Sequence, residues 1–192
     1  MILKRLVVGP YASNCYIIGS EKTREGIIID PGAEADKIMA AVEESGLTIK
    51  LIIVTHGHID HVGAFDQVRT ATKAPAAMHA NDAGERQEEP GKLQFLKDED
   101  TIEIGDMRFT VLHTPGHSSG GISLYGHGIV FSGDTLFNFG IGRYDLPSSD
   151  YQQLVTSLNR LISLPEDTSV LPGHGPDTTV AAEKRGNPFL RF

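Results

Sequence analysis

The sequence contains a single cysteine, Cys15, so a disulfide bond within the chain is excluded. One unpaired thiol fits a reducing compartment, and we expect a cytoplasmic protein. Cys15 lies in an apolar stretch that is typical of a strand. In such surroundings a thiol is more typical of an inert core position than of a nucleophile.

Long apolar runs and an excess of basic residues are also missing. No segment approaches the length that crosses a bilayer, and the charged N-terminal stretch does not resemble a signal peptide. Basic residues number 17 against 25 acidic ones, which gives a formal net charge of −8. Because phosphate groups bind to positive surfaces, we expect neither a nucleic-acid nor a membrane partner.

Internal repeats, low-complexity tracts and linkers are absent from the sequence as well. A chain of 192 residues can bury one sizeable core, so we expect a single domain over residues 1–192. Glycine and proline, by contrast, are plentiful, with 21 and 10 residues. They favour many turns between short strands over a helical bundle.

Apolar runs alternate with helical patterns along the chain, which indicates the α/β class. We expect strands at residues 2–8, 13–18, 26–29, 51–54, 76–79, 101–104, 107–113, 122–125, 129–131 and 169–171. We expect helices at residues 35–45, 63–70, 149–162 and 177–185. Residues 81–100 suggest a surface helix and loop, and residues 137–147 an irregular segment.

The most informative stretch follows the strand at residues 51–54. It places His56, His58, Asp60 and His61 within six residues. All four side chains are ligands that zinc and similar metals prefer. A strand end followed by glycine is a place where the chain can turn and direct several side chains to one point.

The same pattern, a strand, a Gly/Pro turn and then a ligand, recurs at His117, Asp134 and His174. Seven ligands exceed the four that a tetrahedral zinc ion takes, so they favour two metal ions. A carboxylate can bridge two ions and an imidazole cannot. Of the two acids, Asp134 is the one isolated in sequence from the other ligands, and it is therefore the expected bridge. Asp30, also at a strand end, is either a turn former or an acid that points to the same edge.

This constellation resembles the metallo-β-lactamase-fold hydrolases over nearly the whole chain. The resemblance implies a four-layer αβ/βα sandwich. It also implies a first metal on His56, His58 and His117, a second on Asp60, His61 and His174, a bridging Asp134, and an Asp30 that supports the ligands. A lactamase is not expected, because the lactamases of this family carry a metal-binding cysteine where this chain has Asp134.

Within this group the chain is most similar to glyoxalase II, the hydroxyacylglutathione hydrolases. The similarity is carried by residues 114–120, 133–137 and 171–175. Little sequence follows these motifs. We therefore expect a short, single-domain relative without the helical domain that helps glyoxalase II to hold glutathione.

The resemblance implies a binuclear metal-dependent thioesterase acting on S-lactoylglutathione-like hydroxyacyl thioesters through a metal-bridging hydroxide. Asp60 and Asp134 would be catalytic, with two Zn²⁺ ions, or Fe or Mn in their place. Arg143 is either a ligand for a substrate carboxylate or a plain surface arginine, and Tyr144 would line the same pocket. The expected partner is a small-molecule thioester, and the protein a monomer or small homo-oligomer.

Two other functions stay open. A persulfide dioxygenase with one iron on His56, His117 and Asp134 is a group that the chain also resembles. A metal-binding protein without catalysis would close its metal shell with protein ligands, whereas an enzyme keeps one position for water.

Overall fold

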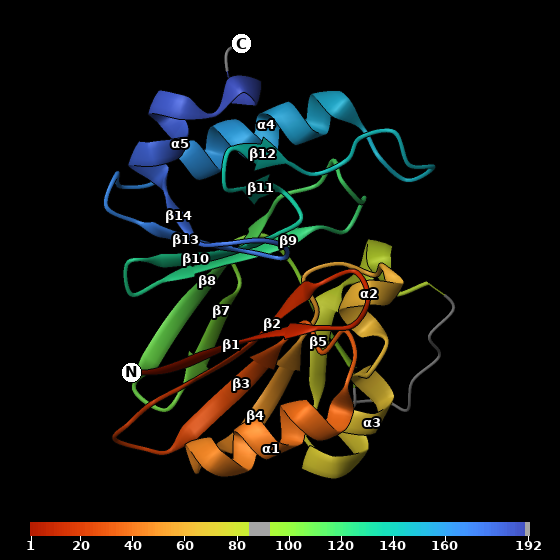
Figure 1. The fold of residues 1–192 in the computed structure, drawn as a ribbon, viewed down its shortest axis with the longest axis vertical. Helices are drawn as coiled ribbons and strands as arrows, with labels where there is room; N and C mark the ends of the chain where they lie inside the picture. Colours follow the sequence, from red (N-terminus) through yellow and green to blue (C-terminus); the bar gives the residue numbers. More distant parts are fainter. Residues whose placement is uncertain (85–92, 191–192) are drawn as a thin grey trace.

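Two six-stranded sheets lie face to face in the computed structural model, which describes residues 1–84 and 93–190 (Figure 1). The first sheet contains, in spatial order, β1 (Ile2–Val8), β2 (Ser13–Gly19), β3 (Glu25–Ile29), β4 (Thr48–Ile53), β5 (Ala76–His79) and β6 (Leu93–Leu96). The second contains β14 (Thr178–Thr179), β13 (Ser169–Pro172), β10 (Ile129–Gly133), β9 (Ile122–Gly126), β8 (Met107–His113) and β7 (Thr101–Ile104).

Helices cover the outer face of each sheet. The first sheet carries α1 (Ala35–Ser45), α2 (Ile59–Val62) and α3 (Phe65–Thr72), and the 3₁₀ turn η1 (Ala80–Asp82) follows β5. The second sheet carries α4 (Tyr151–Ile162) and α5 (Val180–Gly186), the short hairpin of β11 (Leu136–Phe137) and β12 (Gly140–Ile141), and η2 (Pro188–Leu190). The order helix, sheet, sheet, helix confirms the predicted four-layer sandwich (Figure 1).

Three apolar clusters hold these four layers together. Strand β3 shows how alternation builds them: Ile28 packs in the cluster beneath α1 and α3, while Ile27 and Ile29 pack in the cluster between the sheets. The third cluster joins the second sheet to α4 and α5 through residues such as Leu158 and Val180. Cys15 is fully buried in the first cluster, and this burial raises the pKa of its thiol.

Strand direction explains why one edge of the sandwich collects polar residues. Strands β3 and β4 are parallel in the first sheet. In the second sheet, β8 and β10 both run antiparallel to β9, and β10 is parallel to β13. The carboxyl ends of strands that share a direction meet at one edge. The loops that follow β4, β8, β10 and β13 carry the predicted ligands, and the loop that follows β3 carries Asp30.

Several expected elements differ from the structure. The helix expected at 63–70 is α3, at Phe65–Thr72, and it is preceded by the separate single turn α2, which contains His61 and was not predicted. The segment 81–100 contains η1 and β6, and its residues 85–92 lie outside the described part. The segment 137–147 contains the β11–β12 hairpin. Asp150, not Ser149, caps α4 by accepting a hydrogen bond from the Gln153 N–H.

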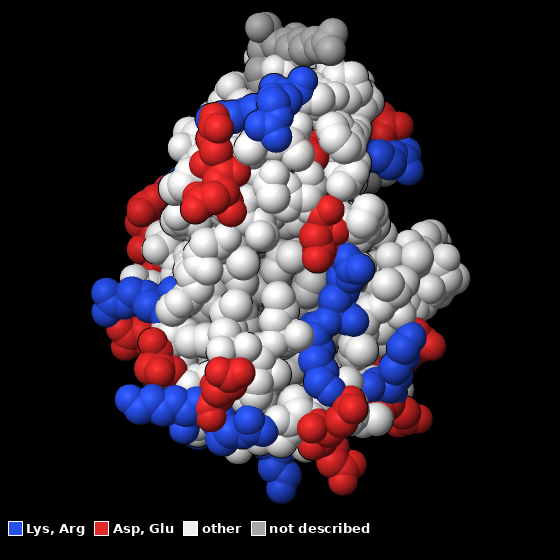
Figure 2. Space-filling view, turned by 60° about the vertical axis from the view of Figure 1, so that its left-hand side comes forward, with Lys and Arg blue, Asp and Glu red and all other residues white. Residues whose placement is uncertain are grey.

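The molecular surface gives two further findings. On the face drawn in Figure 2, basic and acidic side chains lie beside one another around a middle that carries neither. This face therefore shows no continuous basic surface. Among the described helices, none is long and apolar enough to span a bilayer.

Candidate metal centre

The loop after β4 supplies four of the seven predicted ligands. His56 lies three residues after the last residue of β4 and is 2% exposed. His58 is the residue before α2, and Asp60 and His61 lie within its single turn. A strand, a glycine and a short helix thus direct ligands from consecutive positions toward one point.

The other three ligands come from three loops of the second sheet. His117 follows β8, Asp134 follows β10 and His174 follows β13. Gly133 turns the chain into Asp134 with a φ of +49°, a conformation that favours glycine. A Cβ on Gly173 would lie 2.2 Å from the Asp134 Oδ1, so the loop before His174 approaches Asp134 closely only because Gly173 has no side chain.

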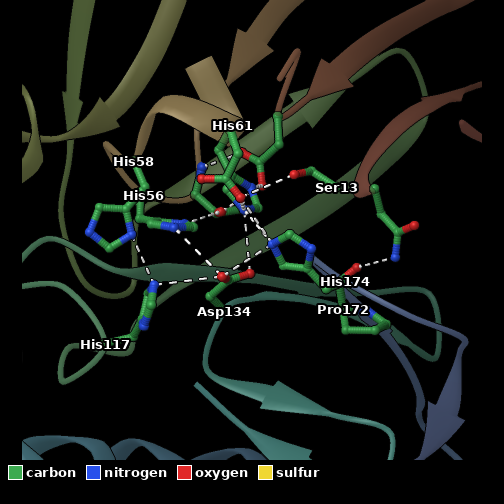
Figure 3. Close-up of polar contacts among 12 residues, drawn as sticks. Ser13, His56, His58, His61, His117, Asp134, Pro172 and His174 are labelled. Carbon is green, nitrogen blue, oxygen red and sulfur yellow. Dashed lines mark hydrogen bonds and ion pairs between the residues drawn. The ribbon is translucent and has the colours of Figure 1, made fainter. Parts of the chain in front are cut away.

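The seven side chains lie together in the structure, and Figure 3 labels all of them except Asp60. His56, His58 and His117 form one group, with the His58 Nδ1 and His117 Nε2 atoms 2.9 Å apart. Asp60, His61 and His174 form a second. There the Asp60 Oδ2 atom lies 3.1 Å from the His174 Nε2 atom and 3.5 Å from the His61 Nε2 atom.

Asp134 lies between the two groups (Figure 3). Its Oδ2 atom is 3.6 Å from the His117 Nε2 atom of the first group and 3.5 Å from the His174 Nε2 atom of the second. Its Oδ1 atom is 3.4 Å from the His61 Nε2 atom. One carboxylate therefore faces ring nitrogens of both groups.

The side chains at this centre fit divalent cations. Among the described residues, the buried His56 Nε2 and Asp134 Oδ1 atoms have no hydrogen-bond partner. A buried polar atom without a partner is costly unless something binds it. Here the orphaned atoms belong to the residue types that zinc and similar ions prefer, and they face other ligand atoms of the same kind.

The remaining ring nitrogens of three histidines contact acceptors outside the cluster. The His117 Nδ1 atom donates to the Arg143 carbonyl oxygen at 2.9 Å, and the His174 Nδ1 atom to the Tyr11 carbonyl oxygen at 3.1 Å. The His61 Nδ1 atom donates to the Asp30 carboxylate at 2.9 Å. With Nδ1 as the donor, the neutral ring leaves its Nε2 lone pair free for a metal.

Asp30 contacts the ligands from outside the cluster. It is 1% exposed and has a φ of +53°. Besides the bond from His61, its two carboxylate oxygens accept the Thr55 N–H at 2.7 Å and the Thr55 hydroxyl at 2.6 Å. Asp30 thus connects the end of β3 to the loop after β4, which carries the first four ligands.

Burial and neighbouring charges shift the pKa values of several predicted ligands, His56, His61 and Asp60 among them. Burial, together with the other imidazoles, holds the pKa of His56 well below its usual range. Burial also disfavours the charged form of His61, but the carboxylates of Asp30, Asp134 and Asp60 together outweigh it and raise the pKa of His61 to about 9. Burial opposes ionisation of Asp60, yet His174 and His61 hold its pKa below the usual range.

The two predicted substrate residues lie at the surface beside the centre. The Arg143 guanidinium binds the Asp145 carboxylate through two hydrogen bonds of 2.9 and 3.0 Å. Its backbone carbonyl, not its side chain, contacts a predicted ligand. Tyr144 is 48% exposed, and its ring lies 4.9 Å from that of Tyr151.

Some residues of the centre gave no signal in the sequence. The Ser13 hydroxyl donates to the Asp60 Oδ2 atom at 3.1 Å, and the Ser149 hydroxyl to the His117 carbonyl oxygen at 2.7 Å. Asp82, in the segment expected as a surface loop, contacts the backbone of two ligand loops. These contacts depend on loop positions that no local pattern specifies.

Comparisons with known proteins agree with this geometry. A family model described as the metallo-beta-lactamase superfamily matches residues 8–174. The probable metallo-hydrolase YqgX of Bacillus subtilis is 38% identical, over 97% of this chain and 96% of that protein. The hydroxyacylglutathione hydrolase GloC of Haemophilus influenzae is 34% identical, over 99% of this chain and 98% of that protein.

Three solved structures with different names are similar to the chain. ETHE1 from Myxococcus xanthus has a TM-score of 0.89 at 36% identity, over 98% of this chain and 84% of that one. TTHA1623 in a di-iron-bound form has a TM-score of 0.87 at 37% identity, over 97% of this chain and 100% of that one. The BLEG-1 B3 metallo-beta-lactamase has a TM-score of 0.89 at 35% identity, over 100% of both chains. Overall likeness therefore does not by itself distinguish a hydroxyacylglutathione hydrolase from a lactamase.

Proposed function

The chain belongs to the metallo-β-lactamase superfamily, and from this premise we propose that it is a binuclear metal-dependent thioesterase. Its substrates would be S-lactoylglutathione-like hydroxyacyl thioesters. The similarity to a hydroxyacylglutathione hydrolase over nearly the full length of both chains supports this substrate class.

The observation that carries the proposal is the position of Asp134 between two ligand groups. His56, His58 and His117 would hold one divalent ion, Asp60, His61 and His174 the other, and Asp134 both. Such ions, when bound, lower the pKa of water toward neutrality and polarise a carbonyl group, which is what ester hydrolysis needs.

Asp60 is the residue that we propose to orient the attacking water. The Ser13 hydroxyl fixes one of its oxygens, and 19% of its side chain stays exposed on the open side of the centre. His174, with 27% of its side chain exposed, borders the same opening. An opening of this kind favours an enzyme over a protein that only stores a metal, because substrate and water must reach the ions.

A thioester suits the centre because its leaving group is a thiolate. A thiol has a pKa near 8.5 in water, so a thiolate can leave without a strong general acid. The centre offers no carboxyl group placed for that role besides the ligands Asp60 and Asp134 among its described residues. An amide or alkyl ester would make larger demands on a proton donor.

An apolar groove beside Asp60 offers space for the acyl part of the substrate. It has a volume of about 310 Å³ and is lined by Val8, Pro10, Tyr11, Ala33, Ile59 and Ala64, among others. Tyr11 and Ile59 are exposed by 67% and 70%, although both are large and apolar. Their exposure next to the metal ligands supports a substrate with an apolar portion.

Hydrolysis of S-lactoylglutathione by the zinc-loaded protein tests the proposal. We expect thioester loss that stops when a chelator removes the metal and returns when zinc is restored. A β-lactam offered in parallel should be hydrolysed at least about 100-fold more slowly, measured as kcat/KM. Faster turnover of the β-lactam, or no thioester turnover with two bound zinc ions, would reject the thioesterase.

A persulfide dioxygenase is the second candidate, because the sequence also resembles that group, and ETHE1 from Myxococcus xanthus is 36% identical to this chain. It would need a single iron on His56, His117 and Asp134. Metal analysis of the purified protein and oxygen uptake with glutathione persulfide distinguish the two. One iron per chain with persulfide-dependent oxygen uptake supports the dioxygenase, and two metals without uptake support the thioesterase.

A further inference from the structure

Asp82 lies outside both ligand groups but touches two of the loops that form the first group. It ends the 3₁₀ turn η1 after β5. Its Oδ2 atom accepts the Gly57 N–H at 3.0 Å, and its Oδ1 atom accepts the Gly120 N–H at 2.6 Å. Gly57 separates His56 from His58, and Gly120 lies three residues after His117.

We propose that Asp82 is a positioning residue that holds these two loops together and so sets the affinity of the first metal site. The inference rests on the metal binding within the proposed function, but not on the thioesterase reaction. It concerns the His56, His58 and His117 group alone.

Steric contacts show that both loops are fitted to Asp82. A Cβ on Gly57 would lie 2.5 Å from the Asp82 carbonyl oxygen. A Cβ on Gly120 would lie 2.7 Å from the Asp82 carboxylate. Side-chain carbons do not approach other atoms this closely, so the contact with Asp82 requires glycine at both positions.

The first group needs such a connection because its ligands come from different sheets. His56 and His58 follow β4 of the first sheet, and His117 follows β8 of the second. The His58 Nδ1 and His117 Nε2 atoms must stay close enough to share an ion, and ligand distances tolerate only about 0.2 Å. One carboxylate bonded to both loops limits their movement relative to each other.

Neighbouring contacts strengthen the same junction. The Asn81 side-chain amide donates to the Ser119 carbonyl oxygen at 3.2 Å, beside Gly120. The Ile122 N–H donates to the Thr55 carbonyl oxygen at 2.9 Å, one residue before His56. Asp82 differs from the residues of these two contacts in carrying a negative charge. The first group consists of uncharged imidazole ligands only, so a nearby carboxylate favours the binding of a cation there.

The test uses the full-length metal-free protein with Asp82→Asn, which keeps the side-chain size but replaces one acceptor and the charge. Zinc affinity is measured by competition with a chromophoric chelator. Asp98→Asn is the control, because the Asp98 carboxylate also accepts a backbone N–H, from His113 at 2.8 Å, and pairs with Arg160, but it bonds to neither Gly57 nor Gly120. We expect Asp82→Asn to weaken one zinc-binding step about 10–100-fold and Asp98→Asn to weaken neither.

Two backgrounds identify the site that is affected. In a His174→Ala protein, which retains the complete first group, Asp82→Asn should still weaken zinc binding about 10–100-fold. In a His58→Ala protein, whose first group is already broken, it should have no further effect on the remaining site. Unfolding of the metal-free proteins is followed by circular dichroism. We expect the Asp82→Asn and Asp98→Asn proteins to have the same unfolding midpoint.

Unchanged zinc affinity in Asp82→Asn would overturn the inference. Equal losses in both backgrounds, or a large fall in metal-free stability, would also overturn it by showing a general structural role. None of these measurements involves substrate. A wild-type protein that binds zinc in two steps but leaves thioesters intact would reject the proposed reaction and leave the role of Asp82 standing.

Discussion

Asp134 is the residue on which the two ligand groups depend together. Its Oδ1 atom has no hydrogen-bond partner among the described residues, and its Oδ2 atom faces ring nitrogens of both groups. Asp134→Ala should therefore reduce bound zinc from two ions to one or fewer per chain. Thioester hydrolysis should fall at least about 100-fold, beyond the effect typical of residues that only contact ligands.

Metal analysis after gel filtration and steady-state kinetics measure these effects of Asp134→Ala. Asp145→Ala is the control, since Asp145 is an exposed acid from the same segment and pairs only with Arg143 in the described contacts. Two zinc ions retained by Asp134→Ala would contradict the bridging position.

Asp30 acts on the centre through His61. Because Asp30 accepts the His61 Nδ1 proton and two bonds from Thr55, Asp30→Asn leaves one of these donors facing an amide N–H. We expect zinc affinity of the Asp60, His61 and His174 group to fall about 10–100-fold. Isothermal titration of the metal-free protein measures it, with the exposed Asp36→Asn on α1 as control. An effect confined to the other group would argue against this role.

At the scale of elements, strands and helices with strong patterns were predictable from the sequence. The helix at Ala35–Ser45 ends at Gly46, whose φ of +63° is a conformation that glycine adopts easily. The β11–β12 hairpin was not predicted, because two-residue strands carry too little alternation to stand out. Its position depends on distant contacts instead.

Glu183 on α5 provides those contacts for the hairpin. It is fully buried and accepts the Phe139 N–H at 3.1 Å, the Thr178 hydroxyl at 2.6 Å and the Asn187 side-chain amide at 2.7 Å. Glu183→Ala would remove this acceptor from all three donors, and only the Asn187 side-chain amide would keep another bond among those described, to the Gly140 carbonyl oxygen at 3.1 Å. We expect it to lower the free energy of unfolding by about 2–4 kcal/mol.

Chemical denaturation measures the effect of Glu183→Ala. The control is Glu166→Ala, whose carboxylate forms a surface ion pair with Lys184 and should contribute less than about 1 kcal/mol. Equal losses in the two variants would show that Glu183 does not hold the hairpin.

At the scale of the whole molecule, the sequence predicted the ligands better than their surroundings. The predicted ligands lie in loops that follow strands and contain glycine, so their type and place in the chain are visible. The contacts of Ser13, Asp82 and Ser149 join loops that are far apart in sequence. Such contacts follow from how the two sheets pack, which local patterns do not determine.

Metal removal should weaken the whole fold, because the ligands come from loops of both sheets. Ions that bind only the folded chain stabilise it by about 4 kcal/mol at a thousandfold excess over the dissociation constant. For a chain of this size, such a loss lowers the unfolding temperature by about 8–16 °C. We expect a shift of this size when a chelator is added to the zinc-loaded protein.

Calorimetry measures this shift, and the same chelator saturated with zinc beforehand is the control. Asp134→Ala should bind fewer ions, so its unfolding temperature should fall less on chelation than that of the wild-type chain. Without ions, the buried His56 Nε2 and Asp134 Oδ1 atoms have no partner to offset their burial. An unfolding temperature that ignores chelation would mean that these atoms are satisfied in another way, and that the cluster does not bind the ions proposed for it.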